Sequence, residues 1–569
     1  MFLKKTTQKN GRINLSITQA YRENGKSKSR TVKNLGFLDE LEQEFNDPIA
    51  HFKVVCEEMT AEYKERTAPI TLTIHPAQKV DMRSNNRKNV GCAIPMAIYD
   101  SLGIETVLNN RQATSKIRFD LNAVMRLLIN ERLFRPGSKK SAYENKDRYF
   151  YKSNFTDDDL YRALDVFASV KDSLIAAANK GTTHIYPRDT SNVFYDVTNY
   201  YFEGESDEMR VKGVSKEHRP NPIIQMGLLQ DANALPMTYK LFAGNTHDSQ
   251  TLLDVLDDMK RDFKVERVVC VADKGLNCSD NIAATIGKGD GFVYSQSIRG
   301  TKSTNALREW TISDEGYKTQ DNDTFKCKSK QGYKIITVED EDGKKTKTRI
   351  DVKYVAFWSL KYEQRARHDR NKTLEKAYQL IKSPSRYTRA THLGAAKYVD
   401  GIAFDKKTGE CLDSGVTPTF NAEALAADEA CDGFYLIVTS ETGWSDDKII
   451  DTYRGLWQIE ETFKITKSDL EFRPVYVHKQ PHVEAHFLTC YISLVIVRLM
   501  QLLTGRKYSA ASMIDDLSHV NCSLLEDNWW HFDHRTEITD ELFALIGETS
   551  PVRYMRTGDI KTLLKKKKF

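Results

Sequence analysis

The chain has 569 residues, 40% of them hydrophobic and 29% charged, which describes a globular protein with enough apolar material for a large core. At roughly 100–200 residues per domain, this length allows about three to five domains. No apolar run approaches the roughly 20 residues of a membrane span, and no secretory signal opens the chain, so we expect no membrane partner. The nine cysteines stand singly, which excludes a disulfide framework and a cysteine-based zinc module and indicates a reduced, cytoplasmic protein.

Positive charge is concentrated at the two ends of the chain. The net charge is only +5, but residues 1–36 hold nine Lys and Arg against one acid, and the last 17 residues hold seven against one. Basic ends on a near-neutral body are typical of proteins that bind a polyanion, most simply nucleic acid. For either end alone, a segment that only improves solubility explains the pattern equally well.

The first 190 residues combine a hairpin with helices. Polar and apolar residues alternate on both sides of the turn-like Glu23-Asn24-Gly25, which predicts a β-hairpin with a basic surface. Further on, apolar residues recur every three or four positions, which predicts helices. The expected elements are strands over 11–21 and 27–35, a helix over 38–63, a short strand over 70–74 and a mostly helical region over 94–180.

The order of the elements changes after Asn192. Three strands come first, followed by a helix, a strand, a helix and a strand. This order, β-β-β-α-β-α-β, is that of an RNase H-like domain, so we expect an α/β fold with an RNase H-like core. The strands are expected over 193–201, 223–229, 237–242, 265–272 and 291–296, and the helices over 249–263 and 280–286.

Residues 300–431 interrupt this pattern with a polar, strand-rich stretch, which we interpret as a β-rich insertion into the core. Its expected elements are strands over 333–338, 348–358 and 398–404 and a charged helix over 362–381, with a solvated hairpin tip over 339–347. The core is expected to resume with a strand over 433–439, a long helix over 446–470 and a buried helix over 486–503. The predicted domains are a hairpin and helical DNA-binding region (1–90), a helical domain (91–190), the two parts of the core (191–299 and 432–505), the insertion (300–431) and a C-terminal region with a basic tail (506–569).

Two aspartates occupy positions where an unpaired carboxylate is costly. Asp196 lies in the middle of the strand F-Y-D-V-T-N, and Asp273 ends the apolar strand V-V-C-V-A-D. An aspartate at a strand end can also cap the following turn, and this alternative stays open for Asp273. An aspartate inside an apolar strand has fewer structural explanations, so its position favours Asp196 as a metal ligand.

A third acid lies on the helix expected over 446–470. Tyr453, Glu460 and Lys467 follow one another at intervals of seven residues, and seven steps of about 100° fall only about 20° short of two full turns. The three residues therefore share one face. An amphipathic helix with surface charges explains this pattern as well, but the two acid-bearing strands upstream favour a metal site.

Three carboxylates suit one chemistry in particular. Two Mg²⁺ ions about 3.5–4 Å apart, held by carboxylates, activate a water or a 3′-hydroxyl and stabilise the leaving oxygen when a phosphodiester is cleaved. Magnesium keeps several of its waters, so three acids suffice, and Mn²⁺ can take its place. Asp196, Asp273 and Glu460 are therefore the candidate metal ligands.

Three motifs together resemble those of the DDE transposases of bacterial insertion sequences. They are D-V-T-N, V-A-D-K-G and Y-R-G-L-W-Q-I-E-E-T-F-K-I-T-K-S, and the last has the spacing Tyr-(6)-Glu-(6)-Lys of the Tyr-Arg-Glu-Lys signature in the insertion-sequence-four superfamily. The segments Ser215–Pro222 and Gly244–Thr251, the basic hairpin and the apolar helix near the C-terminus add to the likeness, which covers most of the chain.

The resemblance assigns roles to individual residues. It implies that Asp196, Asp273 and Glu460 are the catalytic, metal-binding triad, and that Tyr453 and Lys467 contact DNA.

This chain departs from the signature at one position. The signature has an Arg three residues after the Tyr, where this chain has Leu456. Arg454 lies about 240° round the helix from Glu460, which makes it a weaker candidate for the same DNA contact. We expect Glu461 to pair with Arg454 or to face solvent. The other candidate DNA contacts are the hairpin residues Lys26, Lys28 and Arg30.

The activity implied by the resemblance is that of a transposase. Such an enzyme binds the terminal inverted repeats of its element, cleaves the DNA to free 3′-hydroxyls and joins them to target DNA in the presence of Mg²⁺. Because an element has two ends, we expect a homodimer on double-stranded DNA, in the bacterial cytoplasm and at the nucleoid when bound. Two alternatives stay open: an RNase H-like nuclease that cleaves without joining, and a repurposed, non-catalytic DNA-binding protein.

Overall fold

The computed structural model describes residues 1–8, 11–23, 26–67, 71, 77, 79, 86–202, 207–211, 221–247, 251–263, 266–299, 305–320, 323–339, 345–386, 394–404, 411–412, 417–525, 528–565 and 569. The short strand predicted over 70–74, most of the Ser215–Pro222 motif, the tip of the loop over 339–347, the side chain of Lys26 and the lysines 566–568 lie outside the described residues. The chain divides into two compact units, Met1–Met82 and Arg83–Phe569. The finer division into six domains stays a prediction.

The first unit is a three-stranded antiparallel sheet followed by two helices. β2 (Ile13–Glu23) lies between β1 (Phe2–Thr7) and β3 (Lys26–Phe37), and α1 (Leu38–Leu41) and α2 (Pro48–Thr67) follow. The predicted hairpin and helix are confirmed, whereas β1 was not predicted. The side chains of Leu15 and Ile17 on β2 are buried, and the amino group of Met1 donates a hydrogen bond to Thr60 on α2 at 2.5 Å.

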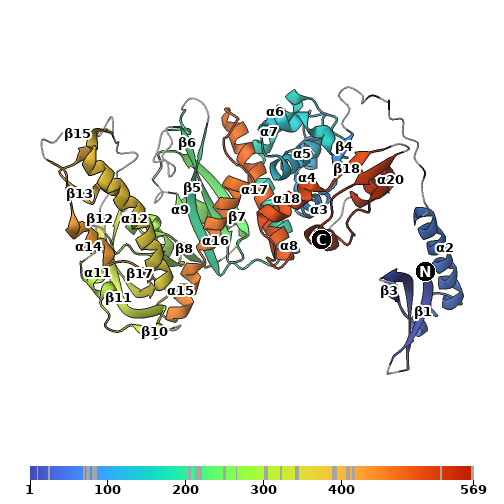
Figure 1. Ribbon diagram of the computed structural model, residues 1–569, viewed down its shortest axis with the longest axis horizontal. Helices are drawn as coiled ribbons and strands as arrows, with labels where there is room; N and C mark the ends of the chain where they lie inside the picture. The colour runs from blue at the N-terminus through green and yellow to red at the C-terminus, as the bar shows by residue number, and fades with distance from the viewer. Residues whose placement is uncertain are drawn as a thin grey trace. The chain divides into compact units, whose positions relative to one another are not determined.

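The helical region predicted over 94–180 is confirmed in the second unit. Its helices pack around α17 (Gln480–Leu503), which also contacts β7 of the central sheet (Figure 1). By length and composition α17 is apolar enough to cross a membrane, but 94% of its most apolar window is buried inside the protein, as in a core helix. The helices are α3 (Ala93–Ser101), α4 (Ile104–Ala113), α5 (Leu121–Phe134), α6 (Lys139–Glu144), α7 (Asp157–Ser169) and α8 (Lys171–Ile185).

Segments from the two ends of this unit form a small antiparallel sheet. β4 (Arg87–Asn89) pairs with β18 (Asn521–Leu524), which is followed in the sheet by β19 (Trp529–Phe532) and β20 (Tyr554–Arg556). The helices around it are α18 (Ala510–His519), α19 (Glu537–Leu545) and α20 (Thr557–Leu563).

The central sheet carries the predicted β-β-β-α-β-α-β order. β5, β6 and β7 are antiparallel neighbours, whereas β5, β8 and β9 run parallel. The spatial order β7-β6-β5-β8-β9 agrees with the expected core. The elements are β5 (Asn192–Tyr201), β6 (Ile223–Asp231), β7 (Pro236–Ala243), α9 (Leu252–Phe263), β8 (Val269–Ala272), α10 (Ser279–Gly287) and β9 (Gly291–Ser295).

The long strands of the predicted insertion extend the same sheet, whereas its short strands pair in two separate two-stranded sheets. β17 (Phe434–Thr439) pairs with β9, and β12, β11 and β10 continue outward from it to give nine strands. The charged helix predicted over 362–381 is α12 (Leu360–Lys382). The other elements here are α11 (Asn305–Ile312), β10 (Lys318–Gln320), β11 (Phe325–Glu339), β12 (Lys345–Ser359), the short strands β13 (Val399–Asp400), β14 (Ala403–Phe404), β15 (Cys411–Leu412) and β16 (Thr419–Phe420), and α14 (Ala422–Glu429).

The two faces of the sheet have separate apolar clusters because side chains alternate along each strand. Tyr195 and Ala272 pack on one face with residues of α9 and of α10. Phe194 and Val271 pack on the other face with Ile449 of α15 (Asp446–Arg454). All nine cysteines are free thiols, in keeping with a reduced protein.

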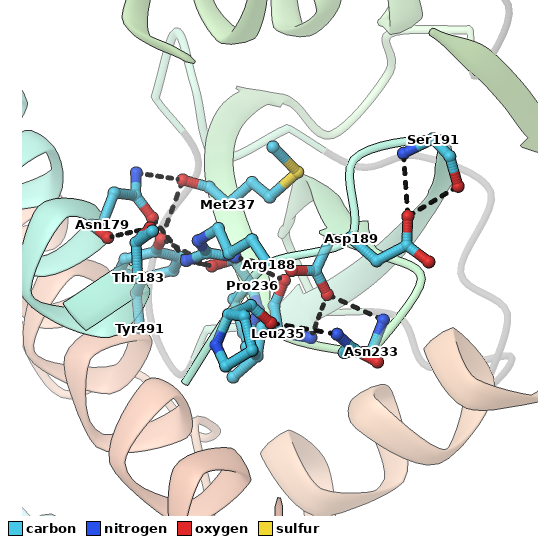
Figure 2. A network of polar contacts seen from close by, with 12 residues as sticks. Asn179, Thr183, Arg188, Asp189, Ser191, Asn233, Leu235, Pro236, Met237 and Tyr491 are labelled. Carbon is cyan, nitrogen blue, oxygen red and sulfur yellow. Dashed lines mark hydrogen bonds and ion pairs between the residues drawn. The ribbon is translucent and has the colours of Figure 1, made fainter. Parts of the chain in front are cut away.

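A buried ion pair joins the sheet to the helical region. Arg188 donates to Asp231, at the end of β6, at 3.2 Å, and the side chains of both residues are almost fully buried. Arg188 also binds Asn179 of α8 and the carbonyl of Pro236, while Tyr491 of α17 donates to the carbonyl of Met237 (Figure 2). Burial raises the pKa of Asp231, and the charge of Arg188 opposes that shift.

The long helix predicted over 446–470 is interrupted, which corrects the expectation of one continuous helix. α15 ends at Arg454, α16 (Trp457–Lys464) follows a tight turn at Gly455 and Leu456, and Ile465–Asp469 forms a π-helical turn. In the tight turn the amide of Leu456 donates to the carbonyl of Tyr453 at 3.0 Å, a bond between residues three apart instead of four. The regular stripe of seven-residue spacing therefore does not extend through this segment.

Candidate active site

The register of two parallel strands brings Asp196 and Asp273 together. Phe194 of β5 pairs with Val271 of β8, so two residues further along, the same register sets Asp196 across from Asp273. Phe194 and Val271 both face α15, and side chains two residues apart share a face. Both aspartates therefore extend the face covered by α15, just beyond its apolar cluster. Asp196 is half-buried and Asp273 is exposed.

Ser295 fixes the position of the Asp273 carboxylate. Ala272 of β8 pairs with Tyr294 of β9, which places Ser295 beside Asp273. The hydroxyl of Ser295 donates to Asp273 Oδ1 at 2.8 Å. On the neighbouring strand, the backbone amide of Val197 donates to Asp196 Oδ1 at 2.7 Å. Both carboxylates thus have one oxygen held by a donor of the sheet.

Tyr453 closes this site from the side of α15. Burial raises the pKa of Tyr453, the hydrogen bond with Ser295 opposes the shift, and the negative charge of Asp273 adds to it. The phenol is therefore neutral at physiological pH and retains a proton that it can donate. The sequence predicted Tyr453 as a site residue but did not single out Ser295, whose only sequence signal is its place after the apolar strand G-F-V-Y.

A glycine allows the turn between α15 and α16 to approach the strand that carries Asp196. A Cβ added at Gly455 would lie 2.5 Å from Cζ of Phe194, closer than packed atoms tolerate. Gly455 sits in the tight turn between α15 and α16, immediately before the segment that carries Glu460. Close packing of the turn against β5 thereby positions Glu460 relative to the two aspartates.

The three predicted acids line a single cleft of about 680 Å³. Asp196 comes from β5, Asp273 from the end of β8 and the exposed Glu460 from α16. Within the described residues, however, no three His, Cys, Asp or Glu side chains are close enough to form a ready metal cluster. The carboxylate oxygens of Asp196, Asp273 and Glu460 suit a hard divalent cation, which takes few protein carboxylates and keeps several waters. The donor chemistry fits such an ion, and Glu460 would complete the site by moving closer.

Cations also line the cleft, from the segment after β9 and from α12 of the insertion. The side chains of Arg299 and Arg365 are 46% and 77% exposed, and both residues line the cleft. Burial raises the pKa of Tyr435, and the charges of Arg365, Arg299 and Asp273 all act on its hydroxyl. Acidic and basic groups thus meet inside one cleft. The sequence pattern did not indicate these arginines, because only the fold brings Arg299 and Arg365, 26 and 92 residues after Asp273, to the same cleft.

Of two other predicted DNA contacts, Arg454 shares the cleft with the acids and Lys467 does not. Arg454 lines the cleft, with its guanidinium 4.6 Å from the ring centre of Phe325 and an ion pair to Asp451 at 3.5 Å. Lys467 is half-exposed in the π-helical turn and is not one of the residues that line the cleft.

The expected pairing of Glu461 with Arg454 is wrong. Glu461 instead pairs with Arg498 of α17 at 3.1 Å. The turn at Gly455 interrupts the regular helix on which that pairing depended. At the position where the signature has Arg, the half-buried Leu456 packs against the apolar clusters of the unit.

The hairpin residues lie in the first unit. Lys28 and Arg30 on β3 are exposed, and the guanidinium of Arg30 donates to Gln19 of β2 at 3.0 Å.

Two family models match the chain. The model described as IS1634 family transposase, N-terminal domain, matches residues 3–70, which covers the first unit from β1 to α2. The model described as Transposase DDE domain matches residues 206–496, just over half of the chain, and includes Asp273 and Glu460. No curated protein matches the chain. The chain therefore belongs to the DDE transposases of insertion sequences, in the IS1634 family, and is a metal-dependent enzyme of DNA cleavage and strand transfer.

Proposed function

We propose that Asp196, Asp273 and Glu460 are the residues with which this transposase binds its divalent metal, Mg²⁺ in the cell, and cleaves DNA. The observation that carries the proposal is that three acids from two strands and a helix line one cleft. When bound, the metal supplies electrostatic stabilisation of the phosphate charge and a more acidic water or 3′-hydroxyl.

The neighbouring side chains have supporting roles. Ser295 orients the carboxylate of Asp273 through its hydrogen bond of 2.8 Å, so that the second oxygen is left to face the metal. Tyr453, whose phenol is neutral at physiological pH, donates a hydrogen bond to a phosphate oxygen of the bound strand. Arg299 and Arg365 also line the cleft, where they pair with Asp432 and Asp369, and in the complex they turn to the phosphates beside the scissile bond.

The first unit recognises the ends of the element. Its exposed Lys28 and Arg30, together with Lys26, present positive charge on β3, which suits the phosphates of a terminal inverted repeat. Two ends must be held at once for joining, so two copies of the chain act together on the DNA, at the nucleoid. Lys467 and Arg454 contact the backbone near the cleaved position.

The experiment uses the purified full chain with a duplex that carries the inverted repeat flanking its gene, a target plasmid, and Mg²⁺ or Mn²⁺. We expect metal-dependent release of a 3′-hydroxyl at the repeat, followed by joined products in the plasmid. Cleavage without joined products would identify a nuclease instead, and binding without cleavage a repurposed DNA-binding protein. With Asp196→Asn, Asp273→Asn and Glu460→Gln, cleavage should be lost and binding retained.

A further inference from the structure

A group of three arginines lies outside the catalytic cleft, where β4, the end of α5 and the segment after α6 meet. Arg87 belongs to β4, Arg135 follows α5, and Arg148 belongs to the short helical turn Lys146–Arg148. None of the three lines the cleft. Arg87 and Arg135 are exposed, and Arg148 is partly exposed.

Hydrogen bonds from neighbouring residues hold the three elements together. Lys88, next to Arg87, donates to the carbonyls of Asp147 and Tyr149 at 2.5 and 3.3 Å. It therefore binds the backbone on both sides of Arg148. Tyr149 in turn donates to Glu131 of α5 at 2.8 Å, one helical turn before Arg135. The backbone thereby places the three guanidinium groups on one surface.

The surface carries three guanidinium groups, and the buried carboxylate of Glu131 offsets only part of their charge. In the part of the chain that the structure describes, none of the three arginines forms an ion pair with an acid. The nearby Glu131 is buried, and its two oxygens accept hydrogen bonds from Tyr149 and Asn145. Partial burial and the charge of Arg135 lower the pKa of Arg148, Tyr149 and Glu131 oppose this shift, and the charge of Arg87 adds to it. Repulsion among the three arginines destabilises the free protein, and binding of an anionic ligand reduces it.

We propose that Arg87, Arg135 and Arg148 form a second phosphate-binding surface for duplex DNA, separate from the catalytic cleft. Guanidinium groups bind phosphate oxygens in a bidentate manner, and three of them on separate elements match successive phosphates of a backbone better than a single small anion. The inference rests on DNA as the partner of the enzyme.

The test measures binding of the full chain to a labelled duplex with the inverted repeat, and to one of scrambled sequence, at several salt concentrations. Replacing all three arginines by Ala should weaken binding to both duplexes alike, because phosphate contacts carry no sequence information. The slope of log K against log salt should fall by about 0.9 for each lost contact, or roughly 2–3 in total. Replacing the three by Lys should restore most of the slope.

The matched control replaces Arg111, Lys116 and Arg118 by Ala. These residues are also exposed and basic, and their loss removes the same charge. An unchanged slope in the Arg87, Arg135 and Arg148 variant, or an equal loss in the control, would overturn the proposal. Single Arg→Gln variants give the same readout if the triple variant does not fold. Failure of the wild-type chain to bind either duplex would instead count against DNA as the partner.

Discussion

The strands that carry Asp196 and Asp273 and the helix that carries Glu460 contribute to one cleft, but they position their side chains by different means. Hydrogen bonds between β5, β8 and β9 fix the register, so the two aspartates and Ser295 lie side by side. Glu460 depends on how closely a tight turn packs against Phe194. The strands hold their two acids in fixed positions, whereas the position of the third can change with the packing of α15 and α16.

The largest expected effect comes from removing a proposed metal ligand, whether it lies on the strands or on the helix. Asp196→Asn, Asp273→Asn and Glu460→Gln should each reduce cleavage by about 10³-fold or more, because a bound metal contributes several kcal/mol to the transition state. Affinity for the inverted repeat should change little. Asp280→Asn, an exposed acid at the start of α10, is the control and should leave cleavage unchanged. A fully active Glu460→Gln variant would remove the helix from the site.

The stability of the sheet that carries the two aspartates depends on the buried ion pair between Arg188 and Asp231 at the end of β6. Asp231→Ala leaves the guanidinium of Arg188 buried without its partner, so the free energy of unfolding should fall by about 3–5 kcal/mol. Urea denaturation measures this loss. Asp451→Ala breaks the exposed pair with Arg454 and should cost less than about 1 kcal/mol. Equal losses in the two variants would show that Asp231 does not anchor the sheet.

The position of Glu460 on α16 depends on close packing at the tight turn that contains Gly455. In Gly455→Ala the new methyl group would collide with Phe194, so α16 should shift and cleavage should fall by up to about 100-fold. Gly443→Ala, whose Cβ would meet no atom within 4 Å, should have no effect. Adding Phe194→Leu should restore part of the activity of Gly455→Ala. If Gly455→Ala is as active as the wild type, the turn does not position Glu460.

A buried lysine at the start of α6 gives a pH-dependent stability. Burial lowers the pKa of Lys139 from 10.5 to about 7, and the charge of Arg132 adds to the shift. Between these two values the unfolded chain holds a proton that the folded chain lacks. The free energy of unfolding should therefore rise with pH by up to about 1.4 kcal/mol per unit across this window, and be lost as the pH falls towards 7. In Lys139→Met this contribution should be absent, and unfolding curves at several pH values measure it.

The smallest effect separates two lysines of the catalytic helix. Lys467→Ala should weaken binding to the inverted repeat by about tenfold or less, as expected for one phosphate contact, and cleavage should fall less than in Glu460→Gln. Lys464→Ala, on the preceding turn, should matter less. Equal effects of the two substitutions would mean that the helix presents only general positive charge.

Local sequence patterns predicted the sheet well because strand periodicity and apolar runs are short-range signals. The β-β-β-α-β-α-β order and the places of Asp196 and Asp273 on it followed from such runs. The break at Gly455 had a signal, a glycine within a helical pattern, but its cause is the contact with Phe194, far away in the chain. The pairing of Glu461 with Arg498 and the cations of the cleft wall depend on tertiary contacts. A single sequence shows no such contacts.

One divalent cation site is expected to lie between the two strands and the helix. Cleavage of the protein backbone by bound Fe²⁺ tests this directly, because the measurement needs neither DNA nor an active enzyme. Fe²⁺ in a magnesium site reduces added hydrogen peroxide to hydroxide and a hydroxyl radical, which cuts the chain near the ligands, and ascorbate returns the Fe³⁺ to Fe²⁺. We predict fragments that end close to Asp196, Asp273 and Glu460, that Mg²⁺ suppresses, and that are lost in Asp273→Asn. Cuts elsewhere, or cuts at these positions that persist in excess Mg²⁺ and in Asp273→Asn, would contradict the account.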